Sequence, residues 1–209
     1  QLRLGTVPNL AEVKEGQEYT ELTLLESQET EIIAKYGNLF SQTWESIVND
    51  DLRAFERIPK LAVDAARRKE DEVALAVLTS NPTMGDSEQL FSAAHGNDAS
   101  DAGEPNTARL NAGWLAMATR TDGDAHLNLT PANIIAPQAL HGAVEKMLVS
   151  RADPTGLNDE VVNIYGPLGT RKLTAIYDAR LDVTNDATWY LVTDPGRYDT
   201  VGVYFLESE

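Results

Sequence analysis

Asp50, Asp51 and His95 are the side chains whose types suit acid–base chemistry. Two adjacent carboxylates can share a proton or bind a cation, and a histidine can transfer protons near neutral pH. Asp50 and Asp51 also stand where a helix is expected to begin, and aspartate is a common N-cap. His95 lies in the loop-like run Ser-Ala-Ala-His-Gly-Asn, where backbone groups usually satisfy a histidine ring. A hydrolase that uses these three residues is therefore a remote alternative.

Other motifs for catalysis or metal binding are weak. The chain has no cysteine, which excludes disulfides, thiolate metal sites and a cysteine nucleophile. His126 and His141 have no second histidine at metal-ligand spacing. Residues 166–170, Gly-Pro-Leu-Gly-Thr, lack the lysine of a phosphate-binding loop and predict a turn. We expect no catalytic residue, no cofactor and no metal ion.

The net charge of the chain restricts the kinds of molecule that it is expected to bind. Seventeen basic residues against thirty-three acidic ones leave a formal net charge of −16. This negative charge repels polyphosphates and anionic membranes. We therefore do not expect strong binding of nucleic acid, because such binding gains its affinity when basic side chains release counterions from the phosphates. No apolar run approaches the roughly 20 residues of a membrane-spanning helix. The composition predicts an acidic, folded globular protein without a membrane partner.

One long helix is expected in the first half of the chain. Pro59 suits the first position of a helix, and Asn81-Pro82 is a stop signal, so the helix should cover residues 59–79. Ala62, Ala66, Val73 and Val77 follow one stripe of that helix. Its charged residues should form ion pairs between positions three or four residues apart on the solvent-exposed face of the helix. A short helix at residues 44–49, with Trp44, Ile47 and Val48 on one side, precedes it.

The first 36 residues predict a long two-stranded ribbon. Residues 30–36 alternate apolar and polar side chains, as a half-exposed strand does, and residues 19–25 are the expected partner. A ribbon of two strands has little core of its own and is marginal in isolation. We therefore expect it to lie on another surface, such as that of a second subunit.

The second half of the chain predicts a mixture of helices and strands. Residues 85–105 are rich in Gly, Ser, Asp and Ala and are the segment most expected to be mobile. A helix capped by Thr107 should follow, and another should begin at Pro137, with Leu140, Val144, Met147 and Leu148 on one face. The fold class is therefore α+β. The expected strands are residues 127–129, 133–136, 161–165, 173–176, 189–192 and 201–206.

A resemblance to a known family begins at residues 34–59, AKYGNLFSQTWESIVNDDLRAFERIP. It continues in order through residues 78–82, 90–97 and 127–140, and through the run from Trp189 to Glu207. This text resembles the Mu-type and prohead-protease-fused major capsid proteins of tailed phages, which carry the Hong Kong 97-like capsid fold. That family normally has an arm before the ribbon and a further strand after residue 207, so the resemblance predicts a processed or partly ordered chain.

The resemblance implies a domain plan. Residues 1–36 would be the extended ribbon called the E-loop. Residues 37–106 would be the peripheral domain, with residues 59–79 as its spine helix. Residues 107–188 would be mostly the axial domain, and residues 189–209 would return toward the peripheral domain.

The resemblance also implies the function. The chain would be a non-enzymatic major capsid protein of the virion, assembled in the bacterial cytoplasm as hexamers and pentamers of an icosahedral shell. Its partners would be copies of itself, the enclosed double-stranded DNA without specific binding, and scaffold, protease, portal or decoration proteins. The structural alternative is an encapsulin-like nanocompartment shell of the same fold, which stores a protein cargo.

Overall fold

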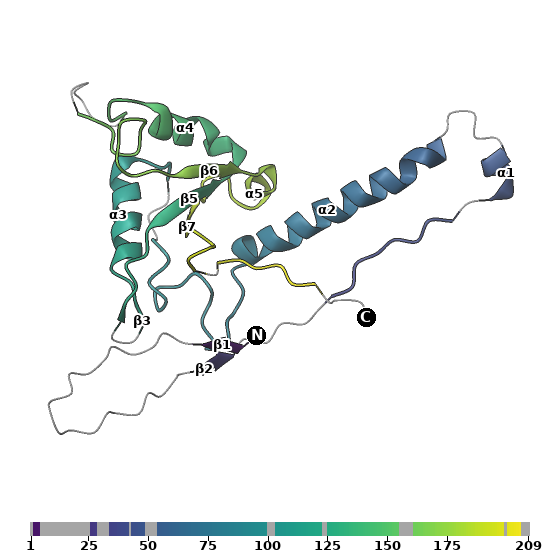
Figure 1. Ribbon diagram of the computed structural model, residues 1–209, viewed down its shortest axis with the longest axis horizontal. Coiled ribbons are helices and arrows are strands. Elements are labelled where there is room, and N and C mark those ends of the chain that lie inside the picture. The colour runs from purple at the N-terminus through teal and green to yellow at the C-terminus, as the bar shows by residue number, and fades with distance from the viewer. Residues whose placement is uncertain are drawn as a thin grey trace. The chain divides into compact units, whose positions relative to one another are not determined.

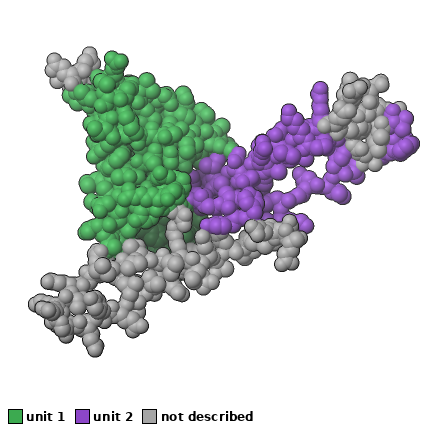
Figure 2. Space-filling model, in the orientation of Figure 1, with its two compact units in different colours: residues 1–30, 81–200 green, residues 31–80, 201–209 purple. Residues whose placement is uncertain are grey.

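The computed structural model describes residues 2–4, 26–28, 34–41, 43–48, 54–99, 103–122, 125–154, 161–198 and 200–205. These residues combine helices and strands, which confirms the α+β class. The chain divides into two compact units (Figure 2). Unit 1 contains residues 1–30 and 81–200, and unit 2 contains residues 31–80 and 201–209. No helix among the described residues is both long and apolar enough to cross a membrane.

Unit 2 consists of a long helix and extended segments. Helix α1 covers Trp44–Val48, as expected, and helix α2 covers Ala54–Ser80 (Figure 1). The expected start of the long helix at residue 59 is wrong, because Pro59 lies inside α2. Pro59 is the sixth residue of α2, so the helix lacks the hydrogen bond that an amide at this position would donate to the Phe55 carbonyl. Residues 34–41 and 200–205 have no regular secondary structure, so the strand expected at residues 201–206 is not formed in its described part.

Unit 1 is organised around a three-stranded sheet. Strand β5 (Pro131–Ala136) lies in the middle, parallel to β6 (Thr174–Tyr177) and antiparallel to β7 (Tyr190–Thr193). Helices α3 (Thr107–Ala118) and α4 (His141–Val149) supply further core residues. The core is the apolar cluster Leu110, Ile134, Ala136, Leu140, Val144, Met147 and Tyr165.

The ends of the helices in unit 1 are capped by side chains. Asn106, and not the expected Thr107, caps α3: its Oδ1 accepts a hydrogen bond from the Arg109 amide at 2.8 Å. Thr107 is the first helical residue, and its hydroxyl donates to Asp153 instead. Pro137 precedes a 3-10 turn, η1 (Gln138–Leu140), which leads into α4. The carboxylate of Asp182, on helix α5 (Ala179–Thr184), accepts from the amides of the first two residues of η1.

Asn163 closes the other end of α4. Its Nδ2 donates to the carbonyls of Met147 and Ser150, and its Oδ1 accepts from the Tyr165 amide at 3.0 Å. Only 1% of Asn163 is exposed. Residues 161–165 form an isolated β-bridge at Val162 followed by a turn, so the strand expected there is wrong. The turn expected at residues 166–170 is confirmed by the bond from the Gly169 amide to the Gly166 carbonyl.

The remaining strands are short. Strands β3 (Thr121–Asp122) and β4 (Ala125–His126) pair antiparallel, whereas residues 127–129, expected as a strand, are irregular. Asn128 there has a φ of 47°, in the left-handed region, which interrupts strand geometry. Strands β1 (Leu2–Leu4) and β2 (Glu26–Gln28) also pair antiparallel. The expected strand at residues 19–25 and most of that at 30–36 lie outside the described residues, and residues 34–36 are not in a strand.

Candidate functional site

The acid–base residues singled out from the sequence do not form a described site. Asp50 and Asp51 lie outside the described residues. His95 lies in a loop, where its Nε2 is 2.7 Å from Asp86 Oδ2 and its Nδ1 is 3.1 Å from the Leu90 carbonyl oxygen. Both ring nitrogens therefore face oxygen acceptors, which suits the protonated imidazolium. No group of three metal-binding side chains occurs among the residues that the structure describes.

The loop around His95 is held by side-chain hydrogen bonds. The Asn81 side chain accepts from the Phe91 amide at 2.6 Å and donates to the Phe91 carbonyl at 3.1 Å. Asn97 binds the Ser92 amide and the Leu90 carbonyl in a similar way. The Phe91 ring packs against Tyr190 of β7, 5.3 Å between centroids. These hydrogen bonds hold residues 81–97 together, and the mobility expected for residues 85–105 stays a prediction.

Titration of the His95 ring tests the contact between His95 and Asp86 in this loop. The hydrogen bond to Asp86 raises the pKa of His95, and the same bond lowers the pKa of Asp86. The ion pair is complete below the ordinary histidine value of about 6.5 and is lost as pH rises through the raised pKa of His95. It is also lost as pH falls through the lowered pKa of Asp86. We expect NMR of the His95 ring to give a pKa above about 6.5, and Asp86→Asn to lower it.

Glu88→Gln is the matched control, because it removes one negative charge from the same exposed loop without removing the bond to His95. An equal change in the His95 pKa in both variants would show that general charge, and not the contact with Asp86, causes the shift.

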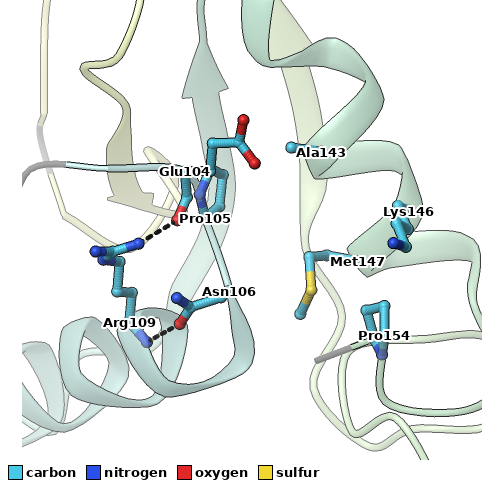
Figure 3. Close-up of a pocket in the computed structure, with 8 residues that line it drawn as sticks. All are labelled: Glu104, Pro105, Asn106, Arg109, Ala143, Lys146, Met147 and Pro154. Atoms are coloured by element: carbon cyan, nitrogen blue, oxygen red, sulfur yellow. Dashed lines mark hydrogen bonds between the residues drawn. The ribbon is translucent and has the colours of Figure 1, made fainter. Parts of the chain in front are cut away.

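Unit 1 has a shallow cleft of about 300 Å³ between the segment before α3 and helix α4 (Figure 3). Arg109, at one edge, donates to the Glu104 carbonyl at 2.8 Å. Met147 lines the opposite wall, beside Lys146. The lining holds charges of both signs but no serine, threonine or histidine that would provide a nucleophile and its base. The cleft therefore offers no recognisable catalytic arrangement.

Unit 2 exposes several large apolar side chains. Leu39 is 97% exposed and Trp44 is 77% exposed, and Tyr36, Phe40 and Val48 are also exposed. These side chains lie on residues 34–41 and on α1. The ring of Tyr36 does lie 5.1 Å from Lys69 Nζ of α2. We call the exposed apolar residues at 36–48 the aromatic arm.

Helix α2 also leaves apolar residues uncovered. The stripe expected from the sequence, Ala62, Ala66, Val73 and Val77, is exposed along its whole length. Only Leu78 of α2 is buried among the residues whose side chains are described. Helices in proteins draw most of their stability from packing of an apolar face, so an exposed stripe on a helix of 27 residues is a candidate contact surface.

Together these features indicate a surface that becomes buried by association. Large exposed apolar patches on folded proteins usually mark interaction sites. The aromatic arm, the stripe of α2 and the exposed Val203, Tyr204 and Phe205 all belong to unit 2. The hydrophobic pattern had located the stripe, but it did not show that the stripe is exposed.

Comparisons with known proteins identify one family. A family model described as phage capsid protein matches residues 28–209. Neither the curated proteins nor the solved structures contain a match.

Proposed function

Since the chain belongs to the phage capsid protein family, we propose that it is a major capsid protein that assembles as hexamers and pentamers of an icosahedral shell. Membership makes it a viral structural protein of the virion that self-assembles into a shell. The finer subtype, a Mu-type or prohead-protease-fused protein of the Hong Kong 97-like fold, is part of the proposal. It rests on the sequence phrases at residues 34–59 and 189–207.

The observation that carries the proposal is the exposed apolar surface of unit 2. A subunit that buries this surface only against neighbours is stable in a shell and incomplete alone. In a closed symmetric shell each subunit repeats the same contacts with several neighbours, and the binding free energies of these interfaces add up. No single interface therefore has to be strong. The role is structural and not catalytic, as is typical of capsid proteins.

The domain plan follows the same proposal. Residues 1–36 serve as the E-loop, residues 37–106 as the peripheral domain, residues 107–188 mostly as the axial domain and residues 189–209 as the return. Helix α2 is then the spine helix. The plan implies that strands β5 and β6 belong to the domain that surrounds the fivefold and sixfold axes, and that β7 belongs to the returning segment.

The acidity of the chain suits a container for DNA. A net charge of −16 gives the subunit little affinity for the phosphate backbone, so the enclosed double-stranded DNA can be packed and released. Scaffold, protease, portal or decoration proteins are the other expected partners, and assembly takes place in the host bacterial cytoplasm.

Electron microscopy of the chain produced in bacteria tests the proposal. We expect closed particles with fivefold and sixfold clusters, and weak binding of free DNA at physiological salt. Single subunits at every concentration, or tight DNA binding by the subunit, would contradict it. Particles from infected cells that hold a protein cargo and no nuclease-protected DNA would instead indicate a nanocompartment shell.

A further inference from the structure

Arg171 is a half-buried arginine of unit 1 that has no acidic partner among the residues that the structure describes. Its Nη1 donates to Asn111 Oδ1 at 2.6 Å and to the Tyr165 hydroxyl at 3.2 Å. Asn111 carries no charge, and burial raises the pKa of Tyr165, so both acceptors are neutral. These contacts therefore leave the positive charge of the guanidinium unbalanced, although the chain has thirty-three acidic residues.

The guanidinium of Arg171 is held in a fixed orientation. Its Cζ lies 4.7 Å from the centre of the Trp114 ring of α3, and the Arg171 amide donates to the Ile164 carbonyl at 3.0 Å. The Nε and Nη2 groups have no acceptor in the described part of the chain, and this edge can donate two parallel hydrogen bonds to one carboxylate. A side chain that is already fixed loses little conformational entropy when it binds such a group.

Exposed apolar side chains belong to the same elements that hold Arg171. Leu115 is exposed on α3, where it follows Trp114 and lies one helical turn beyond Asn111. Leu168 is exposed in the turn that directly precedes Arg171. We call Arg171, Trp114, Leu115 and Leu168 the arginine patch. Tryptophan and arginine are the residue types that most often contribute strongly to binding at protein interfaces.

A second patch, of opposite charge, lies at the other end of β6. Arg171 precedes the first residue of β6, whereas Val183 and Asp186 follow its last residue, on and just beyond α5 (Figure 1). Val183 is 88% exposed. Asp186 is exposed too, in a turn that is fixed by a bond from the Ala187 amide to Asn185 Oδ1 at 2.9 Å. We call Val183 and Asp186 the aspartate patch.

Asp186 differs from most acidic residues of unit 1. No hydrogen bond or ion pair of its carboxylate occurs among the described residues. Other carboxylates accept hydrogen bonds within the chain, namely those of Asp86, Glu145, Asp153, Asp178, Asp182 and Asp194. Glu88 and Glu104 are not flanked by an exposed large apolar residue, whereas Val183 lies three residues before Asp186. Asp186 therefore combines an available charge with an apolar neighbour, as Arg171 does.

We propose that the arginine patch of one subunit binds the aspartate patch of the next subunit in a ring, through an ion pair between Arg171 and Asp186. The proposal rests on the proposed function, because it takes the second copy to be a neighbour in a hexamer or pentamer. A ring needs a head-to-tail contact between two different patches. These two patches differ, carry opposite charges and lie at opposite ends of one strand, as such a contact requires.

The charge of the whole chain favours a second copy as the occupant over DNA. A net charge of −16 repels the phosphate backbone, so one arginine gives little affinity for it. Copies of the subunit repel one another as well, so they should meet where opposite charges can be aligned. The exposed side chains of Leu115, Leu168 and Val183 would exclude water around the ion pair and strengthen it.

Charge reversal in the complete chain tests the contact. Asp186→Arg brings two positive charges together, so the concentration at which half of the chain assembles should rise about tenfold. Arg171→Glu should raise it by at least as much. The double variant Arg171→Glu, Asp186→Arg restores the pair in reversed order and should assemble within about threefold of the wild-type concentration. Light scattering against protein concentration would measure each value.

The matched controls are Glu88→Arg and Arg197→Glu, which make the same changes of charge at exposed residues outside both patches. Each should change the assembly concentration by less than about twofold. Arg171→Glu also removes bonds within unit 1, so circular dichroism must show that it is folded. Asp186→Arg removes no bond of the described structure and keeps the test decisive if Arg171→Glu does not fold.

An equal mixture of the two single variants tests the head-to-tail direction. In a ring of six the variants can alternate, so that every contact joins opposite charges. A ring of five always keeps one contact between like charges. We therefore expect the mixture to recover hexamers better than pentamers, as electron microscopy of the particles would show.

The contact and the proposed function fail in different ways. Normal assembly of Asp186→Arg, or no recovery in a folded double variant, would overturn the contact while wild-type particles leave the proposed function standing. Particles of Arg171→Glu that form normally but hold less DNA would show that Arg171 binds phosphate and would also overturn the contact. Wild-type rings that depend on Arg171 and Asp186 but never close would support the contact and count against the shell. A wild type that forms neither rings nor particles would overturn both.

Discussion

Replacing Asn163 by alanine is expected to lower the free energy of unfolding of unit 1 by roughly 3–5 kcal/mol. The substitution removes all three hydrogen bonds of a buried side chain. The carbonyls of Met147 and Ser150 and the amide of Tyr165 would then lack these partners in a site that water does not reach. Each buried polar group left unsatisfied costs about 1–3 kcal/mol. Urea unfolding followed by circular dichroism would measure the loss.

Two further variants separate hydrogen bonding from packing. Asn163→Asp keeps the volume but turns the donor into an acceptor that faces two carbonyls, so it should destabilise at least as much as alanine. Asn185→Ala is the matched control, because Asn185 is exposed and its side chain binds only the nearby Ala187 amide. Equal losses for Asn163→Ala and Asn185→Ala would show that the buried amide does not hold the end of α4.

Replacing Leu39 and Trp44 of the aromatic arm by serine is expected to block assembly and leave the subunit folded. Both side chains are exposed in the single chain, so little folding energy depends on them. Burying such residues against a neighbour contributes about 1.5–3 kcal/mol each. Each 1.4 kcal/mol changes an association constant about tenfold, so the concentration needed for assembly should rise roughly a hundredfold or more. Light scattering against protein concentration would measure it.

Glu45→Ala is the control for this pair of substitutions, because Glu45 is exposed on the same short helix but adds no apolar contact. Circular dichroism should show all variants equally folded. Assembly of the Leu39→Ser, Trp44→Ser variant at the wild-type concentration would remove the aromatic arm from the interfaces of the shell.

Local sequence signals predicted the helices better than the strands. The stripe of α2 and the apolar face of α4 follow the 3.6-residue period, and both helices are present. The start of α2 was misplaced because Pro59 is favoured at a first helical position, whereas α2 begins five residues earlier and contains Pro59. Helix α5 was missed because it is only six residues long and shows no complete period.

Residues 161–165 show why a strand pattern can mislead. Val161, Val162, Ile164 and Tyr165 have high β-propensity, but propensity reflects fit to a pleated, half-buried surface. Here Asn163 bonds to the end of α4, and among the described residues the segment pairs only as an isolated antiparallel bridge between Val162 and Ala152. That bond joins residues 16 positions apart, which a local pattern does not reveal.

The sequence by itself determined the α+β class, the helical periods, the acidity and, through phrases in family order, the relationship to phage capsid proteins. The tertiary structure decided which apolar residues the chain covers. Helical period places Ala62, Ala66, Val73 and Val77 on one face, but it cannot show whether that face meets the core or remains open. Burial depends on residues distant in sequence, so only the folded chain reveals the open stripe of α2 and the aromatic arm.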